Sequence, residues 1–370
     1  MDKMKKILIL ANSSGGLYDF RNELILKLLS EYEVVVSLPD EVKTKELEEE
    51  GCRVIHTPIN RHGVNPAEDF RLLLKYRRLL KTEKPDLVLT YTIKPNIYGG
   101  FACRMRKVPY ICTITGLGTT FQKQGILLDL IKNMYRAGLK KAECIFFQNE
   151  ENMHIFEKYK IKGKNSVLVS GSGVNLDRHC LEEYPRCEET TFLYVGRMMR
   201  EKGTLELLDA AAKLASSNVK FQLLGYCDED LKEQLDEAEN KGLIQQLGFD
   251  PNVHEYIRQA SALVLPTYHE GMSNVLMEAS ATGRPVIATN ISGCKEIFDE
   301  GITGFGCKPK DSNSLIEALQ KFLALSIAER AQMGRKAREK MEKEFDRTYV
   351  VEHYYKECYK ILTDKNKKEG

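Results

Sequence analysis

Residues 262–289 read ALVLPTYHEGMSNVLMEASATGRPVIAT. This stretch begins with a short apolar run, passes through a polar loop that contains Gly271, continues as a helical pattern, and ends after Pro285 in a second apolar run. Apolar runs of this length on both sides of a helix predict two parallel strands that are buried on both faces. The stretch therefore predicts a βαβ unit in an α/β protein.

Two glutamates, Glu270 and Glu278, are separated by seven residues within this unit. Glu270 falls in the loop at the carboxyl end of the first strand, and Ser273 or Asn274 is the expected N-cap of the helix. A capping box would place Glu or Gln three residues after the cap, where this chain has apolar residues. Glu278 is therefore not a cap, and its apolar neighbours predict a buried carboxylate that needs a partner, such as ligand hydroxyl groups. The backbone amides of residues 271–274 would form an anion site beside it.

The same alternation of strand and helix extends over the whole chain in two series, separated by a polar linker at residues 170–189. We expect two Rossmann-like, doubly wound parallel-sheet domains that face a cleft, over residues 1–171 and 172–345. Residues 346–370 are predicted to form a C-terminal helix that crosses back to the first domain. The predicted strands lie at residues 5–11, 33–39, 52–59, 85–92, 108–116, 142–149 and 165–173, and at 190–198, 219–225, 244–249, 262–267 and 285–289.

The composition places the chain among globular proteins, with 370 residues, 42% apolar and 29% charged. The apolar run at residues 7–11 is too short for a signal peptide or a membrane span. Ten cysteines are scattered singly, which favours free thiols in a reducing cytoplasm over disulfides or a zinc site.

Charge is distributed unevenly along the chain. Residues 1–170 contain 28 Lys and Arg and 20 Asp and Glu, so their net charge is +8. Because the whole chain has a net charge of +2, residues 171–370 carry a net charge of −6. A basic first half favours an anionic partner such as a membrane surface, although ordinary solvated helix faces explain the same charges. The candidate membrane patch is Lys132, Arg136 and Lys140, with Arg71, Lys75 and Arg78 arranged in the same manner on another helix.

Two loops at strand ends are candidates for binding phosphate. Gly15 and Gly16 follow the first strand, where amides at a helix N-terminus can approach an anion. Their spacing does not match the dinucleotide fingerprint G-x-G-x-x-G, so a nicotinamide-linked oxidoreductase is disfavoured. In the second half, Arg197, Arg200 and Lys202 follow a strand, where cations can hold a diphosphate, unless they are ordinary surface charges.

The pair Glu270 and Glu278, with VGRMMREKG at 195–203 and GSGVNLDRH at 171–179, resembles family 4 retaining glycosyltransferases of the GT-B fold. GGLYDFRNELI at 15–25 and TITGLGTTF at 113–121 extend the resemblance over nearly the whole chain. It looks like the bacterial branch that builds capsule, O-antigen and N-glycan precursors on polyprenyl diphosphate, the PglA-like N-acetylgalactosaminyltransferases.

The resemblance implies roles for the matching residues. Glu278 would bind the donor ribose, and the catalytic set would be Glu270, which contacts the transferred sugar, with Arg197 and Lys202 on the diphosphate. Further donor contacts would come from Gly271, Met272, Ser273 and Asn274, and from Gly225 and Tyr226 at the nucleotide base. The acceptor side would include Gly15, Gly16, Tyr91, Thr92, Lys94, Gly116 and Gly118.

The implied partners are a UDP-sugar donor and a polyprenyl-diphosphate-linked saccharide acceptor, with no nucleic acid. The implied enzyme is cytoplasmic and peripheral on the inner face of the cell membrane. We expect no D-x-D metal motif and no divalent ion. Many relatives carry a histidine in the segment that here contains Tyr91, Thr92 and Lys94, which leaves the acceptor-side base open.

Two alternatives remain open at this point. A UDP-sugar epimerase can share the two-domain architecture and the nucleotide. A non-catalytic subunit that binds a nucleotide sugar would also keep the donor residues while dispensing with an acceptor-side base.

Overall fold

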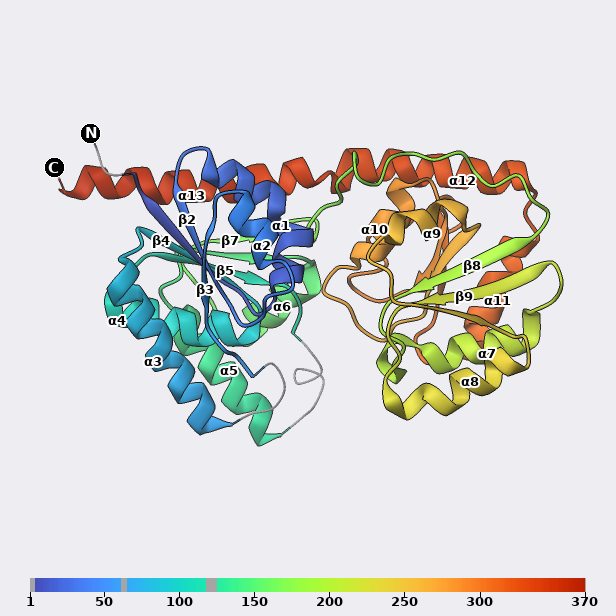
Figure 1. Cartoon of the computed structure of the whole chain (residues 1–370), viewed down its shortest axis with the longest axis horizontal. Helices are drawn as coiled ribbons and strands as arrows, with labels where there is room; N and C mark the ends of the chain where they lie inside the picture. The colour runs from blue at the N-terminus through green and yellow to red at the C-terminus, as the bar shows by residue number, and fades with distance from the viewer. Residues whose placement is uncertain (1–3, 61–64, 118–124, 370) are drawn as a thin grey trace. The chain divides into compact units, whose positions relative to one another are not determined.

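The computed structural model describes residues 4–60, 65–117 and 125–369. The chain divides into two compact units, one of Met1–Ser172 with Thr348–Gly370 and one of Gly173–Arg347. The predicted polar linker at 170–189 is thus mostly part of the second unit. Each unit is a parallel sheet with helices packed against it (Figure 1).

Unit 1 contains a seven-stranded sheet in the order β3-β2-β1-β4-β5-β6-β7. All of its pairings are parallel, and β1, β4, β5 and β6 are almost entirely buried because helices cover the sheet. The strands are β1 Lys6–Leu10, β2 Glu33–Leu38, β3 Arg53–His56, β4 Leu87–Tyr91, β5 Tyr110–Ile114, β6 Cys144–Phe147 and β7 Ser166–Leu168. The helices are α1 Ser14–Leu29, α2 Thr44–Glu49, α3 Pro66–Glu83, η1 Pro95–Gly99, α4 Gly100–Arg106, α5 Ile126–Leu139, α6 Glu150–Lys158 and α13 Arg347–Glu369.

The C-terminal helix α13 packs on the core of unit 1. The Tyr354 ring stacks on Phe146 with centroids 3.8 Å apart, and its hydroxyl lies 2.8 Å from the Thr113 hydroxyl. Residues at the two ends of the sequence therefore share one core.

Unit 2 contains a six-stranded parallel sheet in the order β10-β9-β8-β11-β12-β13. Its strands are β8 Thr190–Val195, β9 Val219–Leu224, β10 Gln245–Gly248, β11 Ala262–Leu265, β12 Val286–Thr289 and β13 Gly304–Cys307. Its helices are η3 Arg200–Lys202, α7 Thr204–Leu214, η4 Glu229–Leu231, α8 Lys232–Asn240, α9 Val253–Gln259, α10 Asn274–Ala281, α11 Ser312–Leu323, α12 Ile327–Lys340 and η5 Met341–Phe345.

The prediction of parallel, doubly wound sheets is confirmed. The stretch at 262–289 forms β11, α10 and β12, and β11 pairs with β12 in parallel with Leu263 opposite Val286. The expected cleft depends on how the two units are placed relative to each other, and it stays a prediction.

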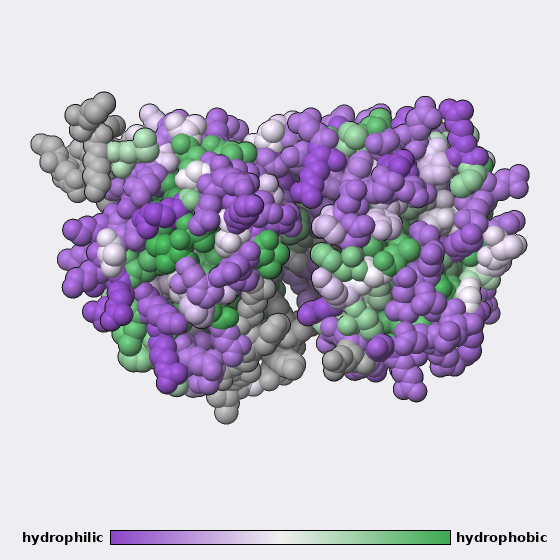
Figure 2. Space-filling view, viewed as in Figure 1, coloured by the Kyte–Doolittle hydropathy of each residue, from purple (hydrophilic) through white to green (hydrophobic). Residues whose placement is uncertain are grey.

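The polarity of the surface agrees with a hydrophobic interior that contains the strands. Figure 2 shows a mostly hydrophilic face on both units, with apolar residues in separate patches. Among the described residues, no helix combines the length and the apolar character that crossing a membrane would need. All ten cysteines are free thiols, as predicted.

Candidate active site

The loops that follow the strands of unit 2 meet at one edge of its sheet. Because all the strands are parallel, their carboxyl ends lie at the same edge, which is where open α/β sheets bind ligands. Arg197 follows β8, Gly225 and Tyr226 follow β9, and Glu270 lies between β11 and α10. The predicted donor-site residues therefore share one edge.

Lys202 and Glu270 form an ion pair across this edge, although 68 residues separate them in the sequence. The side chains keep 29% and 15% exposure, so the pair is accessible from solvent. Gly203 allows the loop after β8 to pack closely against Pro266. A Cβ at residue 203 would lie 2.0 Å from the Pro266 carbonyl oxygen, and φ is +72°. The loop after β8 is therefore held directly against the segment that carries Glu270.

The loops after β8 and β9 are joined by backbone hydrogen bonds. The Met198 amide donates to the Tyr226 carbonyl at 2.7 Å, and the Asp228 amide donates to the Met198 carbonyl at 3.0 Å. This arrangement brings the half-exposed Arg197 guanidinium to 3.7 Å from the Asp228 carboxylate. Sequence reasoning missed Asp228 as a partner.

The expectation that the chain lacks a D-x-D motif is wrong, because residues 228–230 read DED. Asp228 faces Arg197, and Asp230 lies 3.3 Å from Arg200. Both aspartates of the motif therefore form ion pairs with arginines. They do not form a pair of unpartnered carboxylates. Arg200, held by Asp230, remains a half-exposed surface cation.

An aromatic pair lies beside the glycine that ends β9. A Cβ on Gly225 would meet the Gly196 carbonyl oxygen at 2.1 Å, so only glycine fits at this position. The next residue, Tyr226, stacks on Phe249 with centroids 4.4 Å apart and an interplanar angle of 10°. Both rings are more than half exposed, which is unusual for large aromatic side chains. Phe249 was missed, although an aromatic residue directly after β10 could have indicated it.

The start of α10 is more constrained than predicted. Ser273 is the N-cap residue by position, but its side chain makes no capping hydrogen bond. Its amide instead donates to the Gly293 carbonyl at 2.8 Å. The prediction of four free amides at residues 271–274 is therefore wrong for Ser273. Within the described parts of the chain, the buried Asn274 Oδ1 has no hydrogen-bond partner.

Glu278 is less buried than its apolar neighbours suggested, since its side chain keeps 17% exposure. The carboxylate points from α10 towards His179, whose Nε2 lies 3.9 Å from Glu278 Oε1. Burial, and next the neighbouring His254, lowers the pKa of His179 to about 3. At neutral pH the imidazole is uncharged, so it does not neutralise the carboxylate.

In unit 1, Gly15 and Gly16 lie in the first turn of α1. Ser13 Oγ accepts the Gly16 amide at 3.2 Å, and Asp40 accepts the Ser14 amide at 3.0 Å. A Cβ on either glycine would meet nothing closer than 3.6 Å, so neither glycine is required for packing. A methyl group at either position would make only ordinary van der Waals contact with the Ser13 side chain.

The end of β4 at Tyr91 is buried, and the residues that follow it are partly buried. The Tyr91 hydroxyl and Thr92 Oγ1 have no hydrogen-bond partner among the described residues, and Thr92 has φ of +71°. The Lys94 ammonium lies 2.8 Å from the buried Asp69 carboxylate, so this cation already has an anionic partner. Gly116 follows β5 with φ of +142°, whereas Gly118 lies outside the described residues.

The predicted membrane patch on α5 has partners within the protein. The Lys132 ammonium lies 2.5 Å from Asp129 and 4.3 Å from the centre of the Tyr159 ring, and Arg136 donates to the Tyr159 carbonyl at 2.7 Å. Lys140 is exposed. Leu130 on the same helix is 48% exposed, and the buried residues of α5 include Leu128, Tyr135, Gly138 and Leu139.

Two family models match the chain. The family described as "Glycosyl transferase 4-like" matches residues 6–149, and "Glycosyl transferases group 1" matches residues 183–340. The chain is a group 1 glycosyltransferase of family 4. The matched ranges include most of unit 1 and most of unit 2, and the second contains all the residues predicted for the donor site.

Known relatives of this glycosyltransferase make bacterial glycans. The N,N'-diacetylbacillosaminyl-diphospho-undecaprenol alpha-1,3-N-acetylgalactosaminyltransferase of Campylobacter jejuni is 25% identical over 337 residues, 86% of this chain and 89% of that protein. The capsular polysaccharide biosynthesis glycosyltransferase CapM of Staphylococcus aureus is 27% identical over 330 residues, 83% of this chain and 85% of that protein.

A solved structure supports the GT-B fold. Anabaena HepE, crystallised with UDP and glucose, superimposes with a TM-score of 0.80 over 97% of this chain and 100% of that chain, at 17% identity. At this identity the likeness concerns the fold alone.

Proposed function

We propose that the glycosyltransferase moves a sugar, an N-acetylhexosamine or a hexose, from a UDP-sugar to a saccharide linked to polyprenyl diphosphate. The observation that carries the proposal is the Lys202–Glu270 ion pair beside Arg197 at the carboxyl edge of the unit 2 sheet. Support for the acceptor comes from the Campylobacter jejuni relative and from an Escherichia coli relative named as a UDP-Gal:alpha-D-GlcNAc-diphosphoundecaprenol alpha-1,3-galactosyltransferase.

In this proposal Lys202 and Arg197 bind the donor diphosphate. A diphosphate carries more negative charge than the single carboxylate that each cation now faces, so it would compete for the Lys202 ammonium. Glu270 would then be free to accept hydrogen bonds from hydroxyl groups of the transferred sugar. The cations stabilise the charge that develops on the departing UDP, which is the principal electrostatic contribution to such a transfer.

The reaction would retain the anomeric configuration. The acceptor hydroxyl oxygen bonds to the anomeric carbon on the face from which UDP departs, and the bond from that carbon to the phosphate oxygen breaks. The acceptor proton passes to an oxygen of the departing phosphate, so the balance of atoms needs no side-chain base. This route accommodates Tyr91, Thr92 and Lys94 at the position where many relatives have histidine.

Glu278 would bind the two ribose hydroxyls. The carboxylate is partly exposed at the sheet edge, and its neighbour His179 is neutral at pH 7. Each oxygen of a carboxylate can accept a hydrogen bond from one ribose hydroxyl. Tyr226 and Phe249 would pack against the base, because their exposed, stacked rings offer an apolar flat surface next to Gly225.

Unit 1 would hold the acceptor, with Gly15 and Gly16 allowing close approach to phosphate at the start of α1. A membrane-facing surface is part of this proposal, because the acceptor is a lipid. Helix α3 presents Arg71, Lys75 and Arg78 together with the exposed apolar residues Phe70 and Leu74. Cations beside exposed apolar side chains suit an anionic lipid surface better than the partnered cations of α5.

The test is release of UDP from UDP-sugars, measured with and without an undecaprenyl-diphosphate-linked saccharide. We expect release only when both substrates are present, and we expect Glu278→Ala to abolish it while the melting temperature stays near that of the wild type. Epimerised UDP-sugar without released UDP would identify an epimerase. Binding of UDP-sugar without turnover, over a panel of acceptors, would identify a non-catalytic subunit.

A further inference from the structure

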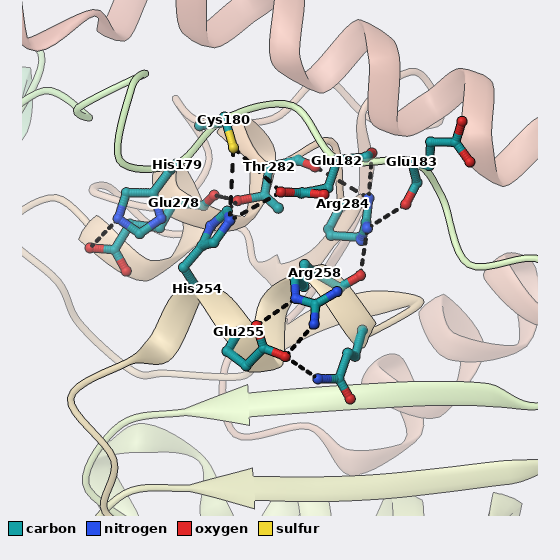
Figure 3. A network of polar contacts seen from close by, with 12 residues as sticks. His179, Cys180, Glu182, Glu183, His254, Glu255, Arg258, Glu278, Thr282 and Arg284 are labelled. Carbon is teal, nitrogen blue, oxygen red and sulfur yellow. Dashed lines mark hydrogen bonds and ion pairs between the residues drawn. The ribbon is translucent and has the colours of Figure 1, made fainter.

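A thiol, a carboxylate and an imidazole converge in unit 2, next to the pair of His179 and Glu278 (Figure 3). Cys180 Sγ lies 3.4 Å from Glu182 Oε1 and 4.0 Å from His254 Nε2, and His254 Nε2 lies 3.5 Å from Glu182 Oε1. We propose that these three side chains form a binding site for Zn²⁺.

The separations suit a single ion. Zinc binds sulfur at about 2.3 Å and nitrogen or oxygen at about 2.0 Å, so tetrahedral ligand atoms stand roughly 3.3 to 3.6 Å apart. Two of the three observed distances fall in that range, and the third exceeds it by a few tenths of an ångström. Cys180 is exposed, and a small side-chain rotation of the cysteine would close that difference.

The backbone that carries the ligands is held in place. Arg284 is fully buried, and its guanidinium donates to the carbonyls of Glu182 at 3.1 Å, Glu183 at 2.7 Å and Arg258 at 2.6 Å. It thereby ties the segment of Cys180 and Glu182 to α9, the helix that carries His254. The Glu182 amide also donates to the Thr282 carbonyl at 3.2 Å. Ligands on a prearranged framework lose little freedom when an ion binds.

The hydrogen bonds of His254 favour the tautomer that a metal needs. The Thr282 hydroxyl donates to the Glu278 carbonyl at 2.8 Å, so its oxygen is left to accept from His254 Nδ1 at 3.4 Å. A proton on Nδ1 leaves the lone pair of Nε2 directed at Cys180 and Glu182. Metal-binding histidines commonly have a partner of this kind on the nitrogen that does not bind the ion.

The three ligand atoms favour Zn²⁺. A thiolate with an imidazole and a carboxylate suits Zn²⁺ better than Mg²⁺ or Ca²⁺, which prefer oxygen ligands alone. The Cys180 thiol now donates its proton to Glu182, and ion binding would release that proton to solvent. Three protein ligands leave the fourth position for water. Sequence spacing could not predict the site, because His254 lies 74 residues from Cys180.

The experiment titrates the full chain, freed of metal by a chelator, with Co²⁺ as a spectroscopic substitute for Zn²⁺. We expect one Co²⁺ per chain, with a thiolate-to-cobalt charge-transfer band that an equimolar amount of Zn²⁺ removes. Cys180→Ser and His254→Gln should each abolish the band. Cys187→Ser, which changes another exposed cysteine of the same segment, should leave it unchanged.

Thermal melts of the metal-free proteins serve as the folding control, because a variant that melts like the wild type has kept its structure. The proposal is overturned if folded wild-type protein gives no charge-transfer band, or if the band persists in Cys180→Ser. Loss of the band in Cys187→Ser with retention in Cys180→Ser would assign the metal to a different cysteine. These measurements do not use donor or acceptor, so they stand apart from the proposed transfer reaction.

Discussion

The carboxyl edges of the two sheets have the same topology and different chemistry. In unit 2 the loops at this edge carry opposite charges in contact, Lys202 with Glu270 and Arg197 with Asp228. In unit 1 the corresponding loops carry small residues such as Gly15 and buried hydroxyls such as that of Tyr91, and the ammonium of Lys94 pairs with a buried carboxylate. The parallel sheet sets where a ligand can bind, and the loop residues set what it can be. An edge with several exposed cations suits a nucleotide diphosphate, and an edge with small residues suits a bulky acceptor.

The largest effect is expected from removing a cation at the unit 2 edge. We expect Lys202→Met to lower acceptor-dependent UDP release by about 10²- to 10³-fold, because a single preorganised donor to the developing charge contributes that much. Lys220→Met is the matched control, since Lys220 lies in β9 and pairs with Glu189 at 2.6 Å. Equal rates of UDP release in the two variants would show that Lys202 is not part of the active site.

The next test concerns the surface of unit 1. Reversing the charges of Arg71, Lys75 and Arg78 to Glu should weaken binding to vesicles of anionic lipid by at least about 100-fold, because each cation near the surface contributes roughly 1 kcal/mol and the new carboxylates are repelled. Reversal of Lys132, Arg136 and Lys140 should do less, because two of those cations have partners within the protein. Flotation with vesicles measures both.

A third variant, with the exposed unit 2 lysines Lys213, Lys241 and Lys343 changed to Glu, controls for overall charge in the vesicle experiment. If all three variants float as well as the wild type, unit 1 has no membrane-binding face.

Substitutions at two glycines test the difference between the unit 2 edge and the unit 1 edge. Gly225→Ala should lower the free energy of unfolding by more than about 2 kcal/mol, because the methyl group would enter the van der Waals space of the Gly196 carbonyl. Gly16→Ala should leave it unchanged or raise it by about 0.5 to 1 kcal/mol, because alanine favours the helix. Urea unfolding measures both changes.

Gly16→Ala should nevertheless reduce acceptor-dependent UDP release, because the methyl group takes space proposed for phosphate. A stable Gly16→Ala protein with wild-type release would show that the start of α1 has no part in the reaction.

The smallest expected effect lies at the aromatic pair. Tyr226→Ala and Phe249→Ala should each weaken UDP binding by about 5- to 10-fold, which corresponds to an aromatic contact of roughly 1 to 1.4 kcal/mol. Tyr359→Ala, at a half-exposed tyrosine on α13, should leave the affinity unchanged. Titration calorimetry with UDP distinguishes these outcomes, and equal affinity in all three variants would exclude the pair from the base site.

The sequence was sufficient for the fold and for placing the candidate donor residues at one edge of a sheet. Apolar runs and helical periodicity located the strands, and their parallel order placed Arg197, Lys202 and Glu270 at one edge. Contacts between distant segments could not be predicted in this way. The Ser273 amide bond to Gly293, the stacking of Phe249 on Tyr226 and the partial exposure of Glu278 depend on tertiary packing, which local patterns do not encode.

Calorimetric titration of UDP into the wild type, Glu278→Ala and Lys94→Met tests most directly whether unit 2 binds the nucleotide. Loss of hydrogen bonds to a charged group costs about 1.5 to 3 kcal/mol, so Glu278→Ala should weaken UDP binding by roughly 10- to 150-fold. Lys94→Met, which alters the edge of unit 1, should bind UDP like the wild type. UDP affinity that is unchanged in Glu278→Ala and lost in Lys94→Met would contradict the assignment of the nucleotide to unit 2.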